Sequence, residues 1–237
     1  MLDQAIRFGA IFAQPEFRAG GKTLEVGSGS RGLAAFTKDP VIGVDIAFEN
    51  RPCANLSAIR ASATNLPLFD ATFDRVVCSD MLEHLHPSQR KDAIRELLRV
   101  TRGTLFLACP CDEGARQVED RLSKLYQMLG VSAPDWLQDH LRKVIPDSDA
   151  IRQTLDEHKA SWREITGEST TAHFFVSLLI SIKIINRLWE FIFRGRANAA
   201  KRLGSARILV GRRHYRKLWV VKPTKPAIEN GSNRGTF

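Results

Sequence analysis

A glycine-rich loop and one acidic residue are the first features of this 237-residue sequence that could do chemistry. Residues 24–32 read LEVGSGSRG, and Asp45 follows eighteen positions after Gly27. Glycines after a strand let the backbone turn sharply and approach a ligand closely, and an acid at the end of the next strand can accept hydrogen bonds from both ribose hydroxyls. The spacing predicts a nucleoside-binding pocket, with an ordinary glycine-rich turn as the alternative.

A second group of reactive side chains follows the apolar run at 73–79. Asp80, Glu83, His84 and His86 stand where the rim of an open α/β site should lie. His84 is the first candidate for a general base because imidazole titrates near neutral pH, and Asp80 is the second. The alternative is that the histidine only stabilises a strand-to-helix loop.

The cysteines predict neither a disulfide framework nor a metal site. Cys53 and Cys78 are isolated, and the Cys-Pro-Cys run at 109–111 lacks a second pair to complete a zinc site. We therefore expect no metal and a reducing compartment. The N-terminus lacks a long apolar run followed by a small-residue cleavage site, so we expect no signal peptide and a cytoplasmic location.

The net charge of +9 is concentrated near the C-terminus. Residues 191–228 hold eleven of the 35 lysines and arginines and no acidic residue, so 24 basic residues face 26 acidic ones elsewhere. Such a block suggests an anionic partner, for example nucleic acid, lipid headgroups or a phosphorylated substrate. The alternative is a solvated surface that favours solubility.

The elements that must position these residues alternate between short apolar runs and helical stretches. Between the last two apolar runs, Ala93, Ile94 and Leu97 recur at helical spacing after Pro87, with Ser88 as the expected N-cap. This alternation predicts an open, mostly parallel α/β sheet. We predict strands at 22–26, 40–45, 73–79 and 104–109, with a weaker one at 58–61.

The second half of the chain has a different pattern. A helical insert at about 111–160 contains the apolar stripe Val118, Leu122, Leu125 and Leu129. Placed after the fifth strand, this lid would cover the carboxyl edge of the sheet and shape an acceptor pocket. The remaining predictions are a strand at 162–168, a helix at about 171–194, a strand at 214–222 and a disordered tail at 223–237.

Four motifs occur in an order that carries a family resemblance. They are Glu25 before the glycine loop, Asp45 in VIGVDI, LPLFDATFDRVVCSDMLEHL at 66–85, and SQRKDAIRELLRVTRGTLFLACP at 88–110. Together they resemble a class I S-adenosylmethionine-dependent methyltransferase. A nicotinamide dehydrogenase shares the glycine loop and the ribose acid but does not explain the segment at 66–85. The resemblance implies a Rossmann-like, doubly wound, mostly parallel seven-stranded sheet in one domain over 1–222.

The resemblance also assigns roles in binding the cofactor S-adenosyl-L-methionine. Gly27 and Gly29 would line its methionine part, and Glu25 would receive its amino group. Asp45 would hold the ribose hydroxyls and Ile46 would cover the adenine. Two positions depart from the family pattern, because Ser62 stands where an acid often contacts the adenine amino group and Arg31 where a third glycine is common. The full predicted cofactor set is Glu25, Gly27, Ser28, Gly29, Asp45, Ile46, Ser62, Ala63 and Asp80.

The acceptor is less constrained than the cofactor. The insert is similar to those of bacterial methyltransferases of cell-surface glycan or glycolipid assembly, so we expect O-methylation of a small-molecule, glycan or lipid-linked acceptor. The basic C-terminal region keeps RNA methylation open, although only Tyr215 and Trp219 there offer rings for base stacking. A non-catalytic cofactor-binding partner protein is the third hypothesis.

The apolar helix at 171–194 raises the question of a membrane. Only fourteen residues, 169–182, run without a charge, fewer than the ~20 needed to span a bilayer. A helix packed on the sheet is favoured, with an in-plane membrane helix or a dimer surface as alternatives. The neighbouring cations predict peripheral contact with an anionic membrane, at its inner face.

Overall fold

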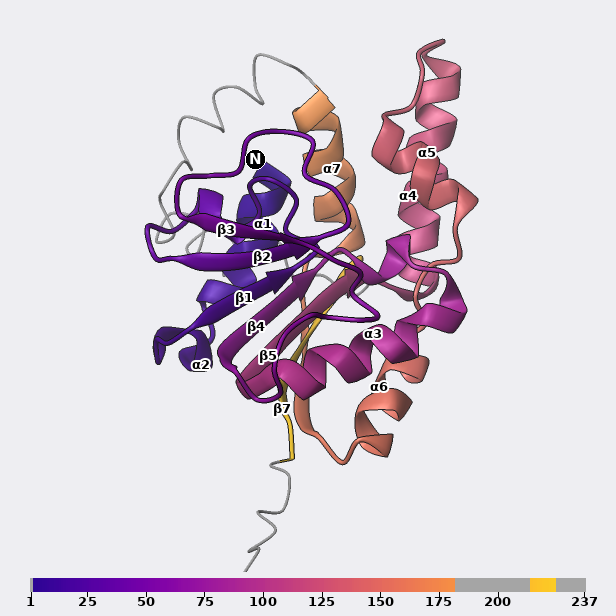
Figure 1. Cartoon of the computed structure of the whole chain (residues 1–237). Helices are drawn as coiled ribbons and strands as arrows, with labels where there is room; N and C mark the ends of the chain where they lie inside the picture. Colours follow the sequence, from indigo (N-terminus) through magenta and orange to yellow (C-terminus); the bar gives the residue numbers. More distant parts are fainter. Residues whose placement is uncertain (1, 182–213, 225–237) are drawn as a thin grey trace, which may run out of the picture.

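The computed structural model describes residues 2–181 and 214–224, and within them one sheet dominates (Figure 1). Its strand order is β3-β2-β1-β4-β5-β7-β6. The first five strands pair in parallel, whereas β7 lies antiparallel to β5 and to β6. The strands are β1 Thr23–Val26, β2 Val41–Asp45, β3 Leu56–Arg60, β4 Phe73–Ser79, β5 Thr101–Pro110, β6 Ser161–Thr166 and β7 Arg216–Lys222. The predicted Rossmann-like seven-stranded fold is thus confirmed for the described residues.

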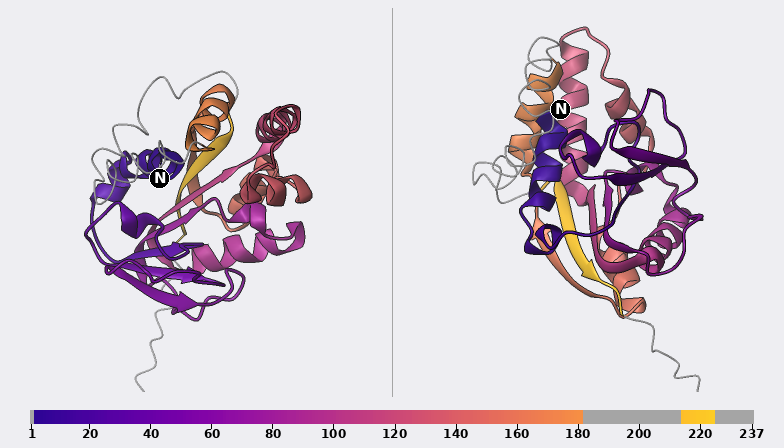
Figure 2. Two further views of the ribbon diagram at one scale, coloured as in Figure 1. Left: turned by 90° about the horizontal axis from the view of Figure 1, so that it is seen from above. Right: turned by 60° about the vertical axis from the view of Figure 1, so that its left-hand side comes forward.

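Helices cover both faces of the sheet (Figure 2). Figure 1 places α3 and α6 on one side and α1 on the other, with α4, α5 and α7 beyond one end of the strands. The helical segments are α1 Leu2–Phe12, α2 Pro15–Arg18, η1 Leu33–Ala35, η2 Leu82–His84, α3 Pro87–Val100, α4 Asp112–Met128, α5 Asp135–Arg142, α6 Ser148–Glu157 and α7 Thr170–Ser181. The insert predicted at 111–160 is therefore helical, as α4, α5 and α6.

Two predictions extend beyond the described residues. The helix predicted at 171–194 is described as α7 up to Ser181, and the residues from which membrane contact was predicted lie mainly within 182–213. The tail predicted from 223 is described only to Thr224. None of the helices in the described ranges is long and apolar enough to cross a membrane.

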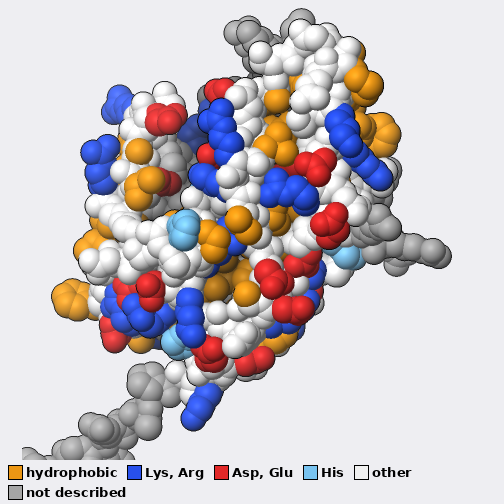
Figure 3. All heavy atoms as spheres, turned by 90° about the vertical axis from the view of Figure 1, so that its right-hand side faces the viewer, with side chains coloured by type: hydrophobic (Ala, Val, Ile, Leu, Met, Phe, Trp, Pro, Cys, Tyr) orange, Lys and Arg blue, Asp and Glu red, His pale blue; other side chains and the backbone are white. Residues whose placement is uncertain are grey.

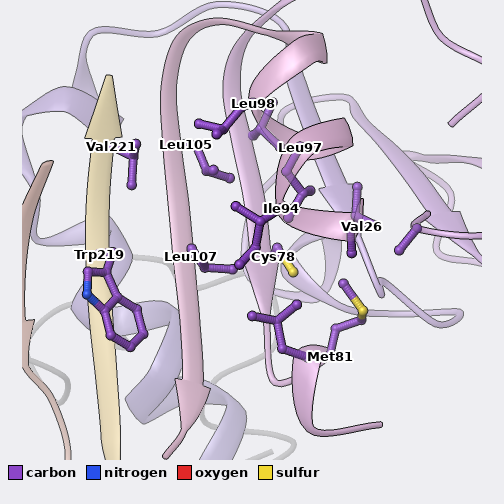
Figure 4. Close-up of a cluster of buried hydrophobic side chains, with 14 of the residues drawn as sticks. Val26, Cys78, Met81, Ile94, Leu97, Leu98, Leu105, Leu107, Trp219 and Val221 are labelled. Atoms are coloured by element: carbon purple, nitrogen blue, oxygen red, sulfur yellow. The ribbon is translucent and has the colours of Figure 1, made fainter. Parts of the chain in front are cut away.

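The central strands alternate between two apolar cores, as a sheet buried on both faces requires. Leu105 and Leu107 of β5 pack with Ile94 and Leu97 of α3, and Figure 4 shows these side chains pointing toward one another. Phe106, between them in the sequence, belongs to the opposite core with α1. Truncating a buried leucine such as Leu97 to alanine would cost about 2–5 kcal/mol of stability.

The start of α3 differs from the prediction. His86 is the N-cap, and its Nδ1 accepts a hydrogen bond from the backbone N–H of Ser88 at 3.4 Å. Pro87 occupies the first helical position, where its missing N–H would have had no partner in any case. Ser88, the predicted N-cap, therefore lies inside the helix, because the ring of His86 supplies the acceptor.

The carboxyl ends of β1, β2 and β4 meet at one edge of the sheet, because these strands are parallel neighbours. Gly27, Asp45 and Asp80 stand at or just after these ends. Asp80 has a φ of +53°, a left-handed conformation that aspartate tolerates better than most residues. The fold thus brings together residues separated by more than fifty positions in the sequence.

Candidate functional site

A cavity of about 830 Å³ lies at this edge of the sheet. One wall is the glycine loop with the ends of β2 and β3, and the other is built from α1, η2, α5, α7 and β7. Of the predicted cofactor residues, the cavity is lined by Gly27, Ser28, Gly29, Asp45, Ile46, Ser62, Ala63 and Asp80. A second cavity of about 610 Å³ lies at the opposite ends of these strands and contains none of the predicted site residues.

The glycine loop is held by backbone hydrogen bonds and by Asp45. Gly27 donates its N–H to the carbonyl of Val44 at 2.8 Å, and Gly29 donates to Oδ2 of Asp45 at 2.8 Å. Both glycines have positive φ, +81° and +51°, which side chains rarely adopt. Asp45 therefore fixes the loop and still faces the cavity with lone pairs for further donors.

Glu25 lies behind the loop and outside the set of cavity-lining residues. Its side chain is buried, and Oε2 accepts the backbone N–H of Leu33 at 2.8 Å. A Cβ at Gly32 would collide with this carboxyl group. Burial raises the pKa of Glu25 to about 8, so the buried carboxyl is neutral in neutral solution. In this geometry Glu25 holds the end of the glycine loop through its hydrogen bond with Leu33.

The predicted adenine end of the cavity is more open. Ile46 is 72% exposed, unusual for an isoleucine, and lines the cavity. The hydroxyl of Ser62 pairs with that of Thr64 at 2.8 Å and also accepts the Thr64 N–H. An exposed apolar side chain at a cavity mouth is available to cover a flat ring.

Asp80 is tied to two guanidinium groups. It accepts hydrogen bonds from Nε and Nη2 of Arg216 at 2.8 and 2.5 Å, and Nη1 of Arg7 lies 3.0 Å away. Burial alone would raise the pKa of Asp80, but the positive charges of Arg216 and Arg7 hold it below its usual value. Such a carboxylate is a poor proton acceptor, which argues against the second predicted base.

Arg216 is the centre of a buried ion network. Besides Asp80 it contacts Glu168 at 2.9 Å and Asp3 at 3.3 Å, and it is only 5% exposed. Arg216 belongs to the basic block at 191–228, for which an anionic partner or a solvated surface was predicted. Residues two positions apart in a strand share one face, so Arg216 lies on the same face of β7 as Leu218 and Val220, which belong to the core containing α1. This spacing is the signal in the sequence that its side chain points inward.

The neighbouring Lys217 is half-buried and forms an ion pair with Asp112 at 2.7 Å. Two of the cations behind the prediction of an anionic partner are therefore already paired with carboxylates of the chain. Figure 3 shows basic and acidic side chains interspersed over the face it presents. Most of the basic block lies in the range that the structure does not describe.

Two histidines meet opposite the glycine loop. His84 of η2 and His140 of α5 have ring centroids 5.1 Å apart, and both line the cavity. Nδ1 of His84 lies 2.9 Å from Oδ2 of Asp139, and Nδ1 of His140 lies 2.8 Å from Oε1 of Glu119. Desolvation lowers the pKa of His84, the predicted base, below the usual range of a histidine.

Glu83 lines the cavity beside these histidines. Its side chain is buried, at 1% exposure, and neither carboxylate oxygen has a hydrogen-bond partner within the described part of the chain. Burial raises the pKa of Glu83 well above its usual value. A buried carboxyl with no partner is costly, so it calls for a functional explanation.

The helix α7 contributes a third histidine, which the sequence analysis did not identify. His173 stacks on Tyr215 with ring centroids 3.4 Å apart, and its Nδ1 lies 3.0 Å from Glu168. Trp136 of α5 lies edge-on to His140 and to His173. The cavity wall opposite the loop is therefore lined with rings that carry polar edges.

The sequence from 24 to 108, which spans β1 to β5, matches the model of the family described as methyltransferase domain. No curated protein matches the chain.

Solved structures share its fold at low sequence identity. The YcgJ protein from Bacillus subtilis is 16% identical over 92% of this chain and 98% of its own, with a TM-score of 0.52. The PH0226 protein from Pyrococcus horikoshii is 16% identical over 88% and 84%, with a TM-score of 0.50. The [4+2]-cyclase SpnF is 16% identical over 92% and 80%, with a TM-score of 0.51. These likenesses concern the fold, and SpnF is described by a different reaction.

Family match and fold agree with the four motifs and with the glycine loop at the carboxyl edge of the sheet. Residues 24–108 therefore form a class I S-adenosylmethionine-dependent methyltransferase domain, the part of an enzyme that takes S-adenosyl-L-methionine as its cofactor.

Proposed function

We propose that the chain transfers the methyl group of S-adenosyl-L-methionine to a hydroxyl oxygen of a small-molecule, glycan or lipid-linked acceptor. The observation that carries this proposal is that a single cavity joins the glycine loop to the wall of histidines and aromatic rings. A sulfonium already carries an activated methyl group, so the protein must mainly hold a nucleophile in line with it. The opposite wall is where that nucleophile would lie.

The lining of this wall suits a hydroxylated ring. Trp136 is half-buried and lines the cavity beside His173 and Tyr215, whose buried rings stack on one another. Lys143 and Ser177 add polar groups to the lining. Aromatic faces bind the apolar face of a ring, while a few polar groups fix its orientation. This combination supports a sugar-like or other polyhydroxylated acceptor within the proposed class.

His84 is the proposed proton acceptor. Because its Nδ1 is engaged by Asp139, Nε2 is the ring nitrogen without a hydrogen-bond partner among the described residues. That nitrogen can accept the proton that the acceptor hydroxyl loses as its oxygen takes the methyl group. For Asp80, held by Arg216 and Arg7, we propose a structural role at the cavity wall.

The class of acceptor is tested by supplying methyl-labelled cofactor to the full chain together with separate RNA, lipid and glycan extracts. We expect label in the glycan, lipid or small-molecule fraction, and none with Asp45→Ala, which removes the carboxylate that holds the loop. Label confined to RNA would overturn the proposal. Cofactor binding without transfer to any fraction would indicate a non-catalytic cofactor-binding protein.

The role of His84 is tested separately with the substrate found. His84→Asn retains a donor near the Nδ1 position and removes Nε2, so kcat should fall about 100-fold, as expected for loss of general base catalysis. His86→Asn is the matched control, because His86 only caps α3. Equal kcat in both variants would mean that positioning alone drives the transfer.

A further inference from the structure

We propose that Glu83, His84 and His140 form a binding site for one divalent first-row metal cation at the acceptor wall of the cavity. Their candidate ligand atoms all lie within 4.8 Å of one another. Two imidazoles and one carboxylate are a donor set that suits zinc, iron, manganese and related ions. This inference goes beyond the proposed function, and metal binding can be measured without any acceptor.

The surroundings of the two histidines are those of metal ligands. A metal-binding imidazole usually donates its second ring N–H to a carboxylate, which fixes its orientation. Here Asp139 stands 2.9 Å from Nδ1 of His84, and Glu119 stands 2.8 Å from Nδ1 of His140. Glu119 is itself held by the hydroxyl of Tyr215 at 3.1 Å. In each ring Nε2 is left for a ligand.

Glu83 supplies the independent observation. The structure buries its carboxyl group in the cavity wall without a hydrogen-bond partner among the described residues. Arg7 and Arg216, the nearby guanidinium groups, are engaged with Asp80 instead. A cation between Glu83 and the two imidazoles would give this carboxylate the partner that it lacks.

The described residues contain a second cluster of possible metal ligands, and it is less suited to a cation than the cluster of Glu83, His84 and His140. Asp3, Glu168 and His173 also lie close together, with ligand atoms within 4.8 Å. There, however, Arg216 already reaches Glu168 at 2.9 Å and Asp3 at 3.3 Å. A permanently charged guanidinium occupies the place of a cation, so a metal ion would be repelled.

Three protein ligands would leave the cation open positions toward the cavity, as in catalytic metal sites. An acceptor hydroxyl bound there would lose its proton more readily, since a cation stabilises the negative oxygen. His84 cannot bind a metal and accept a proton through the same nitrogen. The metal-loaded enzyme would therefore activate the hydroxyl through the cation and release its proton to water, whereas the metal-free enzyme would use His84.

The test is a titration of chelator-treated full-length protein with Mn²⁺, followed by calorimetry and electron paramagnetic resonance, and repeated with Zn²⁺. We expect one ion per chain with a dissociation constant in the micromolar range. Glu83→Gln and His140→Asn should each weaken binding at least tenfold. The control His158→Asn removes an exposed imidazole at the end of α6 and should leave binding unchanged.

Folding of the variants is checked in chelator. Glutamine has the shape of the neutral glutamic acid, and the asparagine amide can still donate to Glu119, so both variants should unfold at the wild-type temperature. Added metal should raise the unfolding temperature of the wild type and of His158→Asn only. The absence of binding at about 1 mM metal, or equal binding by all variants, would overturn the proposal.

Discussion

The two ends of the cavity are built in different ways. The loop end comes from residues 26–63, which are close in the sequence, and its contacts run mainly through the backbone, as in the hydrogen bond from Gly29 to Asp45. The acceptor end gathers side chains from α1, η2, α5, α7 and β7. The loop end can bind a cofactor through backbone geometry that one short segment sets, whereas the acceptor end depends on how separate elements pack. This contrast predicts which substitutions act on stability and which on cofactor binding.

The largest effect is expected at the acceptor end, with Arg216→Met. Three carboxylates, those of Asp3, Asp80 and Glu168, lose a buried partner together. Breaking a buried ion pair by removing one member costs about 3–5 kcal/mol of unfolding free energy. Urea denaturation should show a loss of this size.

The matched control is Lys217→Met, one position along β7. Its ion pair with Asp112 is partly exposed, so we expect a loss of about 1 kcal/mol. Similar losses in the two variants would show that the network around Arg216 has no special importance. The idea that the acceptor end depends on buried side-chain contacts between separate elements would then be wrong.

The next effect concerns the loop end, where Gly27→Val should remove measurable cofactor binding. Gly27 has a φ of +81°, and a Cβ there would lie 2.8 Å from the side chain of Met81. We expect calorimetry to show at least a 100-fold loss of affinity, which corresponds to about 2.7 kcal/mol.

Gly20→Ala separates backbone strain from the clash. Gly20 has nearly the same φ, +79°, but a Cβ there meets nothing within 4 Å. This control should be destabilised by about 1–2 kcal/mol and should bind cofactor normally. Normal binding by folded Gly27→Val would contradict the assignment of the loop.

A smaller effect is expected from Glu25, through the dependence of stability on pH. Its pKa is about 8 in the folded protein, above its ordinary value of 4.5. Between these values the folded chain retains a proton that the unfolded chain releases, so the free energy of unfolding falls as pH rises. One such proton gives a slope of about 1.4 kcal/mol per pH unit.

Glu25→Gln is the comparison for this slope, because glutamine stays neutral and can still accept from Leu33. Urea denaturation at pH 5.5, 6.5 and 7.5 should show the variant gaining stability relative to the wild type as pH increases. Parallel curves for the two proteins would mean that the carboxyl of Glu25 is ionised in the folded state, which would be inconsistent with its burial.

Much of the fold could be predicted because its signals are local. The strand predicted at 73–79 has the bounds of β4, and the insert predicted at about 111–160 is helical. Glycine spacing and the position of Asp45 placed the loop end of the cavity for the same reason. The N-cap of α3 was missed because histidine is an uncommon capping residue, and His86 had been considered only as part of the reactive group after β4.

The acceptor end could not be predicted in the same way. Asp3 and Arg216 are 213 positions apart in the sequence, and no local pattern indicates that they form an ion pair. Glu83 was noticed among reactive residues, but its burial without a partner depends on tertiary packing. No metal was predicted because the Cys-Pro-Cys run at 109–111 lacks a second pair of ligands. His84 and His140 belong to different elements, η2 and α5, so no local pattern indicates that they lie close together.

The smallest predicted effect is a gain of affinity at the loop end, from Ser62→Asp. Ser62 lines the cavity near Ile46, and its hydroxyl is at present engaged with Thr64. A carboxylate there would accept a hydrogen bond from the adenine amino group more strongly than a hydroxyl does, by about 1 kcal/mol, or roughly fivefold in affinity. Ser57→Asp adds the same charge on β3 at the other cavity and should not change cofactor affinity. Equal gains in the two variants would indicate a general charge effect. No gain from Ser62→Asp would mean that the adenine amino group lies away from Ser62. The position of the adenine could then not be inferred from the backbone of the loop end.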